Sequence, residues 1–188
     1  MNDNIFEKMT NQLRETIDSS VALALHNKNQ EVQIVHLIWA LLTNTNSVLN
    51  QLLNKMNVNK AAIELEAKSN ASKLPSVSSV TKESIKLSRE LYESFQKAQG
   101  QMASNGDKFI AIDTWLISNF DNKVIKDILG KYIDLKEAKK ELEAMRAGKT
   151  IDSNSGDDNL EALSKYGIDL NKKAIDGELD PVIGRDEQ

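Results

Sequence analysis

The chain begins with a helical pattern of apolar side chains. Over residues 5–25 these side chains recur at spacings of three and four, which places them on one face of a helix. A second apolar run covers residues 34–42, and Ser47 and Asn59 then stand where the N-caps of two short helices are expected. Pro75 and the serines after it mark a break. The pattern therefore predicts four helices before Pro75.

The same order of elements returns after the break. A helical pattern covers residues 81–104, and a second apolar run follows over residues 112–120. Asn122 is the expected N-cap of a third helix, and Asp134 that of a fourth helix ending near Gly148. The second half of the pattern thus also predicts four helices.

Residue identities support a repeat. Segment 46–55 aligns with segment 122–131, where four of ten positions are identical and two more exchange leucine for isoleucine. We therefore expect an all-α fold of two four-helix repeats, about residues 5–75 and 80–148. The repeats should pack about a pseudo-two-fold axis and leave a groove between them.

Composition agrees with a globular helical domain. The 188 residues include only two prolines, and 40% are hydrophobic and 28% charged. A net charge of −4 argues against a nucleic-acid binder, and no apolar run approaches the roughly 20 residues that cross a bilayer. The lack of cysteine excludes disulfides and thiolate metal sites. We expect a cytoplasmic location and neither nucleic acid nor membrane as partner.

The last forty residues differ from the rest. Residues 149–159 are polar and acidic without apolar periodicity, so they are predicted to be a flexible linker, with residues 1–148 as the folded domain. Residues 160–188 have too few apolar positions for a core of their own and are expected to belong to a further domain.

The sequence contains no recognisable catalytic or metal-binding motif. The glycines lack the spacing of a phosphate-binding loop, and His26 and His36 are too far apart to bind one metal from one helix. His36, in an apolar helix, is expected to be a core residue with satisfied hydrogen bonds, and Trp39 and Trp115 are expected to pack in the core. Asp113 is predicted to be a helix N-cap. We expect no enzymatic activity and no cofactor in these residues.

The tail has a specific sequence. Lys-Tyr-Gly-Ile-Asp-Leu at 165–170 and Leu-Asp-Pro-Val-Ile-Gly-Arg at 179–185 resemble the start of the first ATPase domain in the ClpB disaggregases, a family of ring-forming AAA+ chaperones. The doubled four-helix unit resembles the Clp N-terminal domain. The resemblance implies that residues 160–188 begin an ATPase domain and that the chain is the N-terminal part of a longer protein. That protein is implied to use ATP and magnesium, to form a homohexamer and to cooperate with a DnaK-type chaperone.

The resemblance also implies a function. The domain would recruit unfolded or aggregated proteins to the disaggregase by binding their exposed hydrophobic segments in the groove between the repeats, and the isolated domain would be a monomer. Asp113 stands where the family commonly has glutamate, and Thr114 where leucine is usual. The expected substrate-binding residues are Thr10, Leu13, Leu91, Phe95, Asp107 and Asp113.

Two alternatives remain open. A domain like that of the related ClpC unfoldases would bind a folded adaptor and serve a protease. A structural helical-repeat scaffold would bind a folded partner tightly and have no affinity for unfolded chains.

Overall fold

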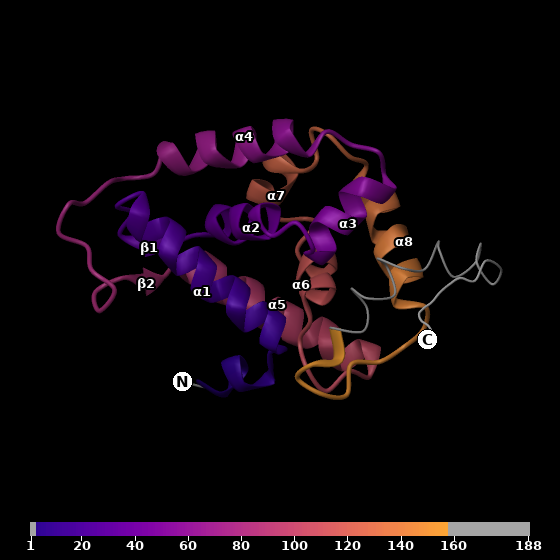
Figure 1. The fold of residues 1–188 in the computed structure, drawn as a ribbon. Helices are drawn as coiled ribbons and strands as arrows, with labels where there is room; N and C mark the ends of the chain where they lie inside the picture. Colours follow the sequence, from indigo (N-terminus) through magenta and orange to yellow (C-terminus); the bar gives the residue numbers. More distant parts are fainter. Residues whose placement is uncertain (1–2, 158–188) are drawn as a thin grey trace, which may run out of the picture.

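The computed structural model describes residues 3–157, in which two similar sets of four helices pack together (Figure 1). The first set is α1 (Asn11–His26), α2 (Ile34–Thr43), α3 (Val48–Lys55) and α4 (Lys60–Ser72). The second is α5 (Arg89–Asn105), α6 (Ile112–Ser118), α7 (Lys123–Ile128) and α8 (Leu135–Arg146). A 3-10 helix, η1 (Asp3–Lys8), and two-residue strands β1 (Glu31–Val32) and β2 (Lys86–Leu87) complete these elements. The all-α class with two four-helix repeats is confirmed.

Backbone pairing reveals the symmetry between the repeats. β1, which precedes α2, pairs in parallel with β2, which precedes α5. In the same way Met9, before α1, pairs in parallel with Ile110, before α6. Exchanging the repeats maps one pairing onto the other. The halves consequently share a single apolar core that includes side chains from both.

Short-range signals fix where most helices begin. Thr10 and Ser88 occupy equivalent places, and their hydroxyls accept hydrogen bonds from the amides of Leu13 and Leu91 in the first turns of α1 and α5. The predicted N-caps that accept first-turn amides in the same way are Ser47, Asn59, Asn122 and Asp134.

The expectation of one helix over residues 5–25, and of another over 81–104, is wrong at the N-terminal end of each. The helix is interrupted at Met9 because the backbone there pairs with the segment before α6. The Thr10 amide, for example, donates to the Ile110 carbonyl at 3.0 Å. Correspondingly, the Ser88 amide donates to the carbonyl of Val32 at 2.9 Å. Long-range pairing at these two places overrides a continuous helical pattern.

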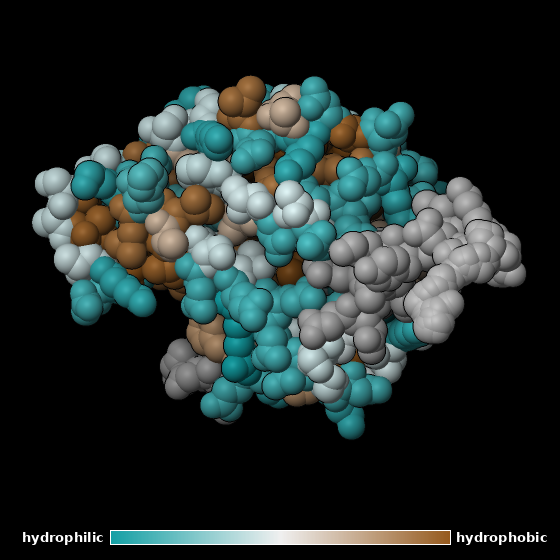
Figure 2. Space-filling model, viewed as in Figure 1, coloured by the Kyte–Doolittle hydropathy of each residue, from teal (hydrophilic) through white to brown (hydrophobic). Residues whose placement is uncertain are grey.

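The core contains most of the large apolar side chains. Trp115 is buried, its indole N–H donates to Ser94 Oγ at 2.8 Å, and its ring lies 6.4 Å from that of Phe95. Trp39 is half-buried and packs against the same core. On the face drawn in Figure 2, apolar surface gathers at the end near β1 and β2 and on α4.

Beyond α8 the chain turns back onto the domain. Ala147 and Gly148 have φ values of 52° and 78°, and the residues after them lie against the start of α1 and the loop before α6. Ile151 is 1% exposed, and Asp157 is also buried. Contacts of Ile151, Asn154 and Asp157 therefore hold residues 150–157 against the domain, although most of their side chains are exposed. A flexible linker was expected over 149–159. The predicted ATPase start at 160–188 lies outside the described residues.

Candidate functional site

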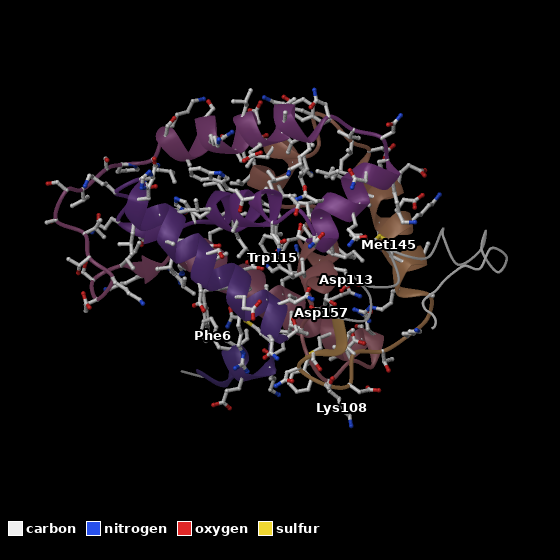
Figure 3. The ribbon with its side chains drawn as sticks, viewed as in Figure 1. Phe6, Lys108, Asp113, Trp115, Met145 and Asp157 are labelled. Atoms are coloured by element: carbon white, nitrogen blue, oxygen red, sulfur yellow. The ribbon has the colours of Figure 1, made fainter. Side chains whose placement is uncertain are left out.

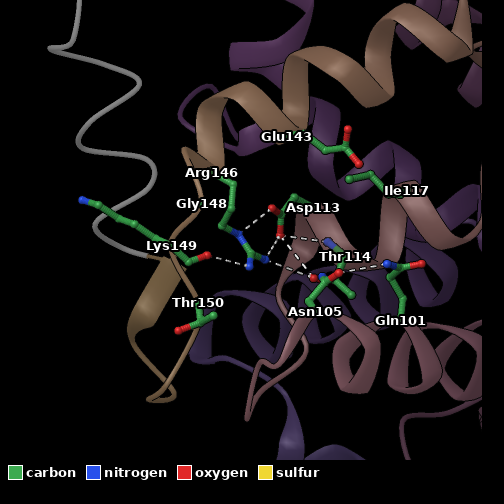
Figure 4. A pocket seen from close by; sticks show the side chains of 10 residues that line it. All are labelled: Gln101, Asn105, Asp113, Thr114, Ile117, Glu143, Arg146, Gly148, Lys149 and Thr150. Carbon is green, nitrogen blue, oxygen red and sulfur yellow. Dashed lines mark hydrogen bonds and ion pairs between the residues drawn. The ribbon is translucent and has the colours of Figure 1, made fainter.

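A buried arginine joins the two aspartates that the sequence singled out, and Figure 4 shows its contact with Asp113. Arg146, the last residue of α8, donates from Nε and Nη2 to the two carboxylate oxygens of Asp113, at 3.0 and 2.9 Å. Its Nη1 lies 3.0 Å from both carboxylate oxygens of Asp107. The bidentate geometry fixes the planar guanidinium between α6 and the end of α5.

Each aspartate is positioned by a helix end. Gly106 ends α5 in the left-handed conformation, with φ of 78°, and Asp107 follows directly. Asp113 lies in the first turn of α6, whose N-cap is Ala111, so the prediction of Asp113 as N-cap is wrong. Its carboxylate is directed to Arg146, and only the adjacent amide of Thr114 donates to it from the helix backbone.

The charges in this cluster stabilise each other. Burial by itself lowers the pKa of Arg146, whereas the hydrogen bonds and negative charges of Asp113 and Asp107 raise it. The raising effects together are larger, so the pKa lies above its ordinary value. The Thr114 hydroxyl also accepts from Arg146 Nη2, at 3.2 Å. Thr114 thus supplies a further acceptor for the guanidinium.

A cavity of about 270 Å³ opens beside the arginine, between α5, α6 and α8. Figure 4 shows Asp113, Thr114 and Arg146 meeting at its wall, with Gln101 and Ile117 from α5 and α6 nearby. The lining is mixed in polarity. This cavity can accommodate a side chain next to the ion-pair cluster.

Thr10 joins the cluster through the segment after α8. The Thr10 hydroxyl donates to Asp157 Oδ2 at 2.8 Å, while the amide of Ile151 donates to Asp107 Oδ1 at 2.9 Å. Asp113 and Asp157 are labelled in Figure 3, near the helix ends that meet here. The structure therefore brings Thr10, Asp107 and Asp113 to one side of the domain.

The apolar residues expected at the site do not line an open groove. Leu13, Leu91 and Phe95 are 1%, 0% and 0% exposed, respectively. The ring of Phe6, in η1, lies 6.2 Å from that of Phe95 and packs with it in the core. The prediction that these three side chains form the groove wall is wrong, because Leu13 and Leu91 in the first turns of α1 and α5, and Phe95 in the second turn of α5, face the shared core.

His36 is a satisfied core residue, as predicted. Its Nδ1 accepts from the amide of Gln33 at 2.8 Å, so its other nitrogen carries the proton and donates to Asn29 Oδ1 at 2.9 Å. Burial lowers its pKa to about 4. Within residues 3–157 no group of three or more acidic or histidine side chains is arranged to hold a metal ion.

Two residues of this site were missed in the sequence. Arg146 belongs to a helix whose charges alternate in sign, which indicates a solvated face. Ile151 stands alone in a polar stretch. Their positions could have indicated a role. Arg146 stands at the predicted C-terminus of a helix, and Ile151 is one aliphatic residue among eight polar or small ones over residues 149–157.

Comparisons with known proteins agree with this architecture. Residues 8–132 match the model of the Clp repeat (R) N-terminal domain, and the chain belongs to that family. It is 55% identical over 185 residues to the chaperone protein ClpB of Wolinella succinogenes, covering 98% of this chain and 22% of the relative. The chain thus resembles the N-terminal part of a ClpB chaperone and spans about a fifth of that protein's length.

Solved structures show the same fold. The Hsp104 N-terminal domain from Candida albicans superposes with a TM-score of 0.72 at 20% identity, covering 80% of this chain and 99% of that one. A complex of the ClpV N-domain with a VipB peptide gives a TM-score of 0.61 at 15% identity, covering 80% and 93%. In residues 3–157, no helix has the length and apolar character to cross a membrane.

Proposed function

We propose that this domain recruits unfolded or aggregated proteins to an ATP-dependent disaggregase by binding their exposed hydrophobic segments. The similarity to ClpB chaperones supports the class of protein, and a related fold bound to a peptide supports the type of ligand. The domain itself carries out no chemistry in this proposal. ATP and magnesium act in the remainder of a homohexameric, cytoplasmic protein that cooperates with a DnaK-type chaperone.

One contact carries the proposed binding mode. Asp107 accepts a hydrogen bond from a backbone amide while the side chain of that residue, Ile151, is buried beside it. A carboxylate that binds a main-chain N–H next to an apolar site can hold any chain that presents an aliphatic residue, without a longer sequence code. We assign this role to Asp107 in client binding. Arg146 holds Asp107 in place, and Asp113 orients Arg146 from the other side.

The substitution Asp107→Asn tests this assignment. It removes the charge of the acceptor while Asp113 still neutralises Arg146, so the domain should remain folded. Losing the charge-assisted part of one hydrogen bond costs about 1 kcal/mol, which weakens affinity roughly fivefold. Binding of a reduced, carboxymethylated and hence unfolded model protein would be measured by titration calorimetry, at a temperature where both proteins are folded.

Asp18→Asn is the matched control. Asp18 is exposed on α1, and its substitution should leave client affinity unchanged. Because Asp107 also binds the amide of Ile151 within the chain, the comparison of Asp107→Asn with wild type is repeated with Ile151→Ser in both chains to weaken that internal contact. Equal affinity of these two chains would contradict the proposed site. Failure of the wild-type chain to bind any unfolded protein, together with tight binding of a folded partner, would instead favour an adaptor-binding or scaffold role.

A further inference from the structure

The segment after α8 occupies the surface to which a client is assigned above. Residues 150–157 are called the docked segment from here on. The amide of Ile151 donates to Asp107 Oδ1 at 2.9 Å, and its carbonyl accepts from the amide of Lys108 at 2.8 Å. Its side chain packs with Ala111 and Phe109. Both backbone groups and the side chain of one residue are thus bound, as they would be in an incoming peptide.

The docked segment makes a second attachment at the start of α1. The carbonyl of Asn154 accepts from the amide of Asn11, the first residue of α1, at 2.7 Å, and Asp157 accepts from the Thr10 hydroxyl at 2.8 Å. First-turn amides of a helix have no partner within it, and the helix dipole favours a negative charge there. The segment therefore satisfies groups that a client backbone would also satisfy.

Gly156 lets the docked segment fold over its own anchor. A Cβ at this position would lie 2.9 Å from Cγ2 of Ile151, closer than side-chain carbon atoms approach each other. Any other residue at position 156 therefore has to push against the buried isoleucine. The compact turn depends on a residue that belongs to the segment and not to the surface beneath it.

We infer that the docked segment is an intramolecular competitor, and that a client binds by displacing it from Asp107, Lys108 and the start of α1. The inference rests on the function proposed above. It also defines the minimal ligand: a chain with an aliphatic residue whose N–H and C=O are both free, followed by a free carbonyl three residues later. A carboxylate six residues later would add a contact with Thr10 but is not required. The apparent affinity for a client then equals the intrinsic affinity multiplied by the fraction of molecules in which the segment is not docked.

Two substitutions loosen the segment without altering the surface that receives it. Ile151→Ser removes the aliphatic anchor, and Gly156→Ala crowds it. Both should tighten binding of the unfolded model protein, by about 10- to 100-fold for Ile151→Ser and by less for Gly156→Ala, because a larger fraction of molecules is open. Ser155→Ala, at an exposed position of the same segment, should leave the affinity unchanged. Unaltered or weaker binding by both loosened variants would overturn the inference.

Hydrogen exchange of the wild-type chain provides a test that needs no variant. Saturation with the unfolded model protein should speed exchange of the Ile151 amide, because Asp107 changes partner. Unchanged or slower exchange at Ile151 in a saturated complex would overturn the competition while leaving the proposed function standing. If neither the wild-type chain nor the loosened variants bind the unfolded protein, both proposals fail.

Discussion

At the scale of single residues, Arg146 determines whether two buried carboxylates are tolerated. The side chains of Asp107 and Asp113 are 0% and 7% exposed, and each would be costly to bury as an unpaired charge. The guanidinium donates to both and also to the carbonyl of Lys149. The arginine thereby couples the end of α8 to the binding surface proposed above.

Arg146→Met should destabilise the domain by about 3–5 kcal/mol, because the apolar stem is retained while two carboxylates lose their counter-ion. Urea unfolding followed by circular dichroism measures this. Arg89→Ala is the control: Arg89 pairs with Glu93 on an exposed helix face, with its side chain 91% exposed. That substitution should cost less than about 0.5 kcal/mol. Similar losses of stability in the two variants would show that the buried ion-pair cluster stabilises the domain no more than an exposed ion pair does.

His36 makes stability depend on pH. Burial lowers its pKa from 6.5 to about 4, so the unfolded chain binds the proton more readily than the folded one. The stabilisation is therefore complete above pH 6.5 and is lost as pH falls from 6.5 towards 4, by at most about 3 kcal/mol. Protonation also removes the Nδ1 acceptor for the amide of Gln33.

Urea unfolding between pH 4.5 and 7.5 would measure the pH dependence due to His36. His36→Gln should flatten the pH profile relative to wild type, whereas His26→Gln, at an exposed position, should leave the profile unchanged. Parallel profiles for wild type and His36→Gln would show that His36 does not titrate in this window.

At the scale of elements, the sequence predicts what depends on neighbours along the chain. Helical spacing and capping side chains correctly place the starts of the helices at Ser47, Asn59, Asn122 and Asp134. The errors occur where a distant segment decides. The helical pattern continues through Met9 and through Lys86, but parallel pairing with the other repeat interrupts it there. Two-residue strands carry no periodicity from which such pairing could be predicted.

The paired caps Thr10 and Ser88 allow the two repeats to be compared. Ser88→Ala should cost about 1 kcal/mol, the usual value of an N-cap. Thr10→Ala should cost about 2 kcal/mol, because its hydroxyl also donates to Asp157. Thr10→Ser keeps both hydrogen bonds and should change stability little. Urea unfolding of the three variants checks the order, and equal losses for Thr10→Ala and Ser88→Ala would mean that the contact with Asp157 adds no stability.

At the scale of the whole molecule, repeat order and fold class could be predicted because each repeat carries its own signals. The site could be predicted only in part. The resemblance to the Clp N-terminal domain implied a site at Thr10, Asp107 and Asp113, which do gather on one side, but it also led us to expect Leu13 at an open groove. Periodicity identifies an apolar face without saying whether a second repeat covers it. The packing of residues 150–157 depends on backbone partners more than forty positions earlier, which local composition does not reveal.

The limits of the folded unit follow from that packing. A chain ending at residue 148 lacks Ile151, whose burial contributes roughly 1.5–3 kcal/mol. It also loses the hydrogen bonds that the segment makes with Asp107, Lys108 and Asn11. We expect it to be about 2–4 kcal/mol less stable than a chain ending at 157 and to melt roughly 5–12 °C lower. Its helical circular dichroism at 20 °C should be nearly the same, because α1 to α8 remain complete.

Ile151→Ser in the chain ending at 157 should reproduce most of the decrease in melting temperature. If the chains ending at 148 and 157 melt at the same temperature, the docked segment contributes no net stability and the domain ends at α8. A large decrease that Ile151→Ser fails to reproduce would place the stabilisation in the contacts with the start of α1. In that case the attachment of Asn154 and Asp157, which meets the first turn of α1, would hold the segment on the domain.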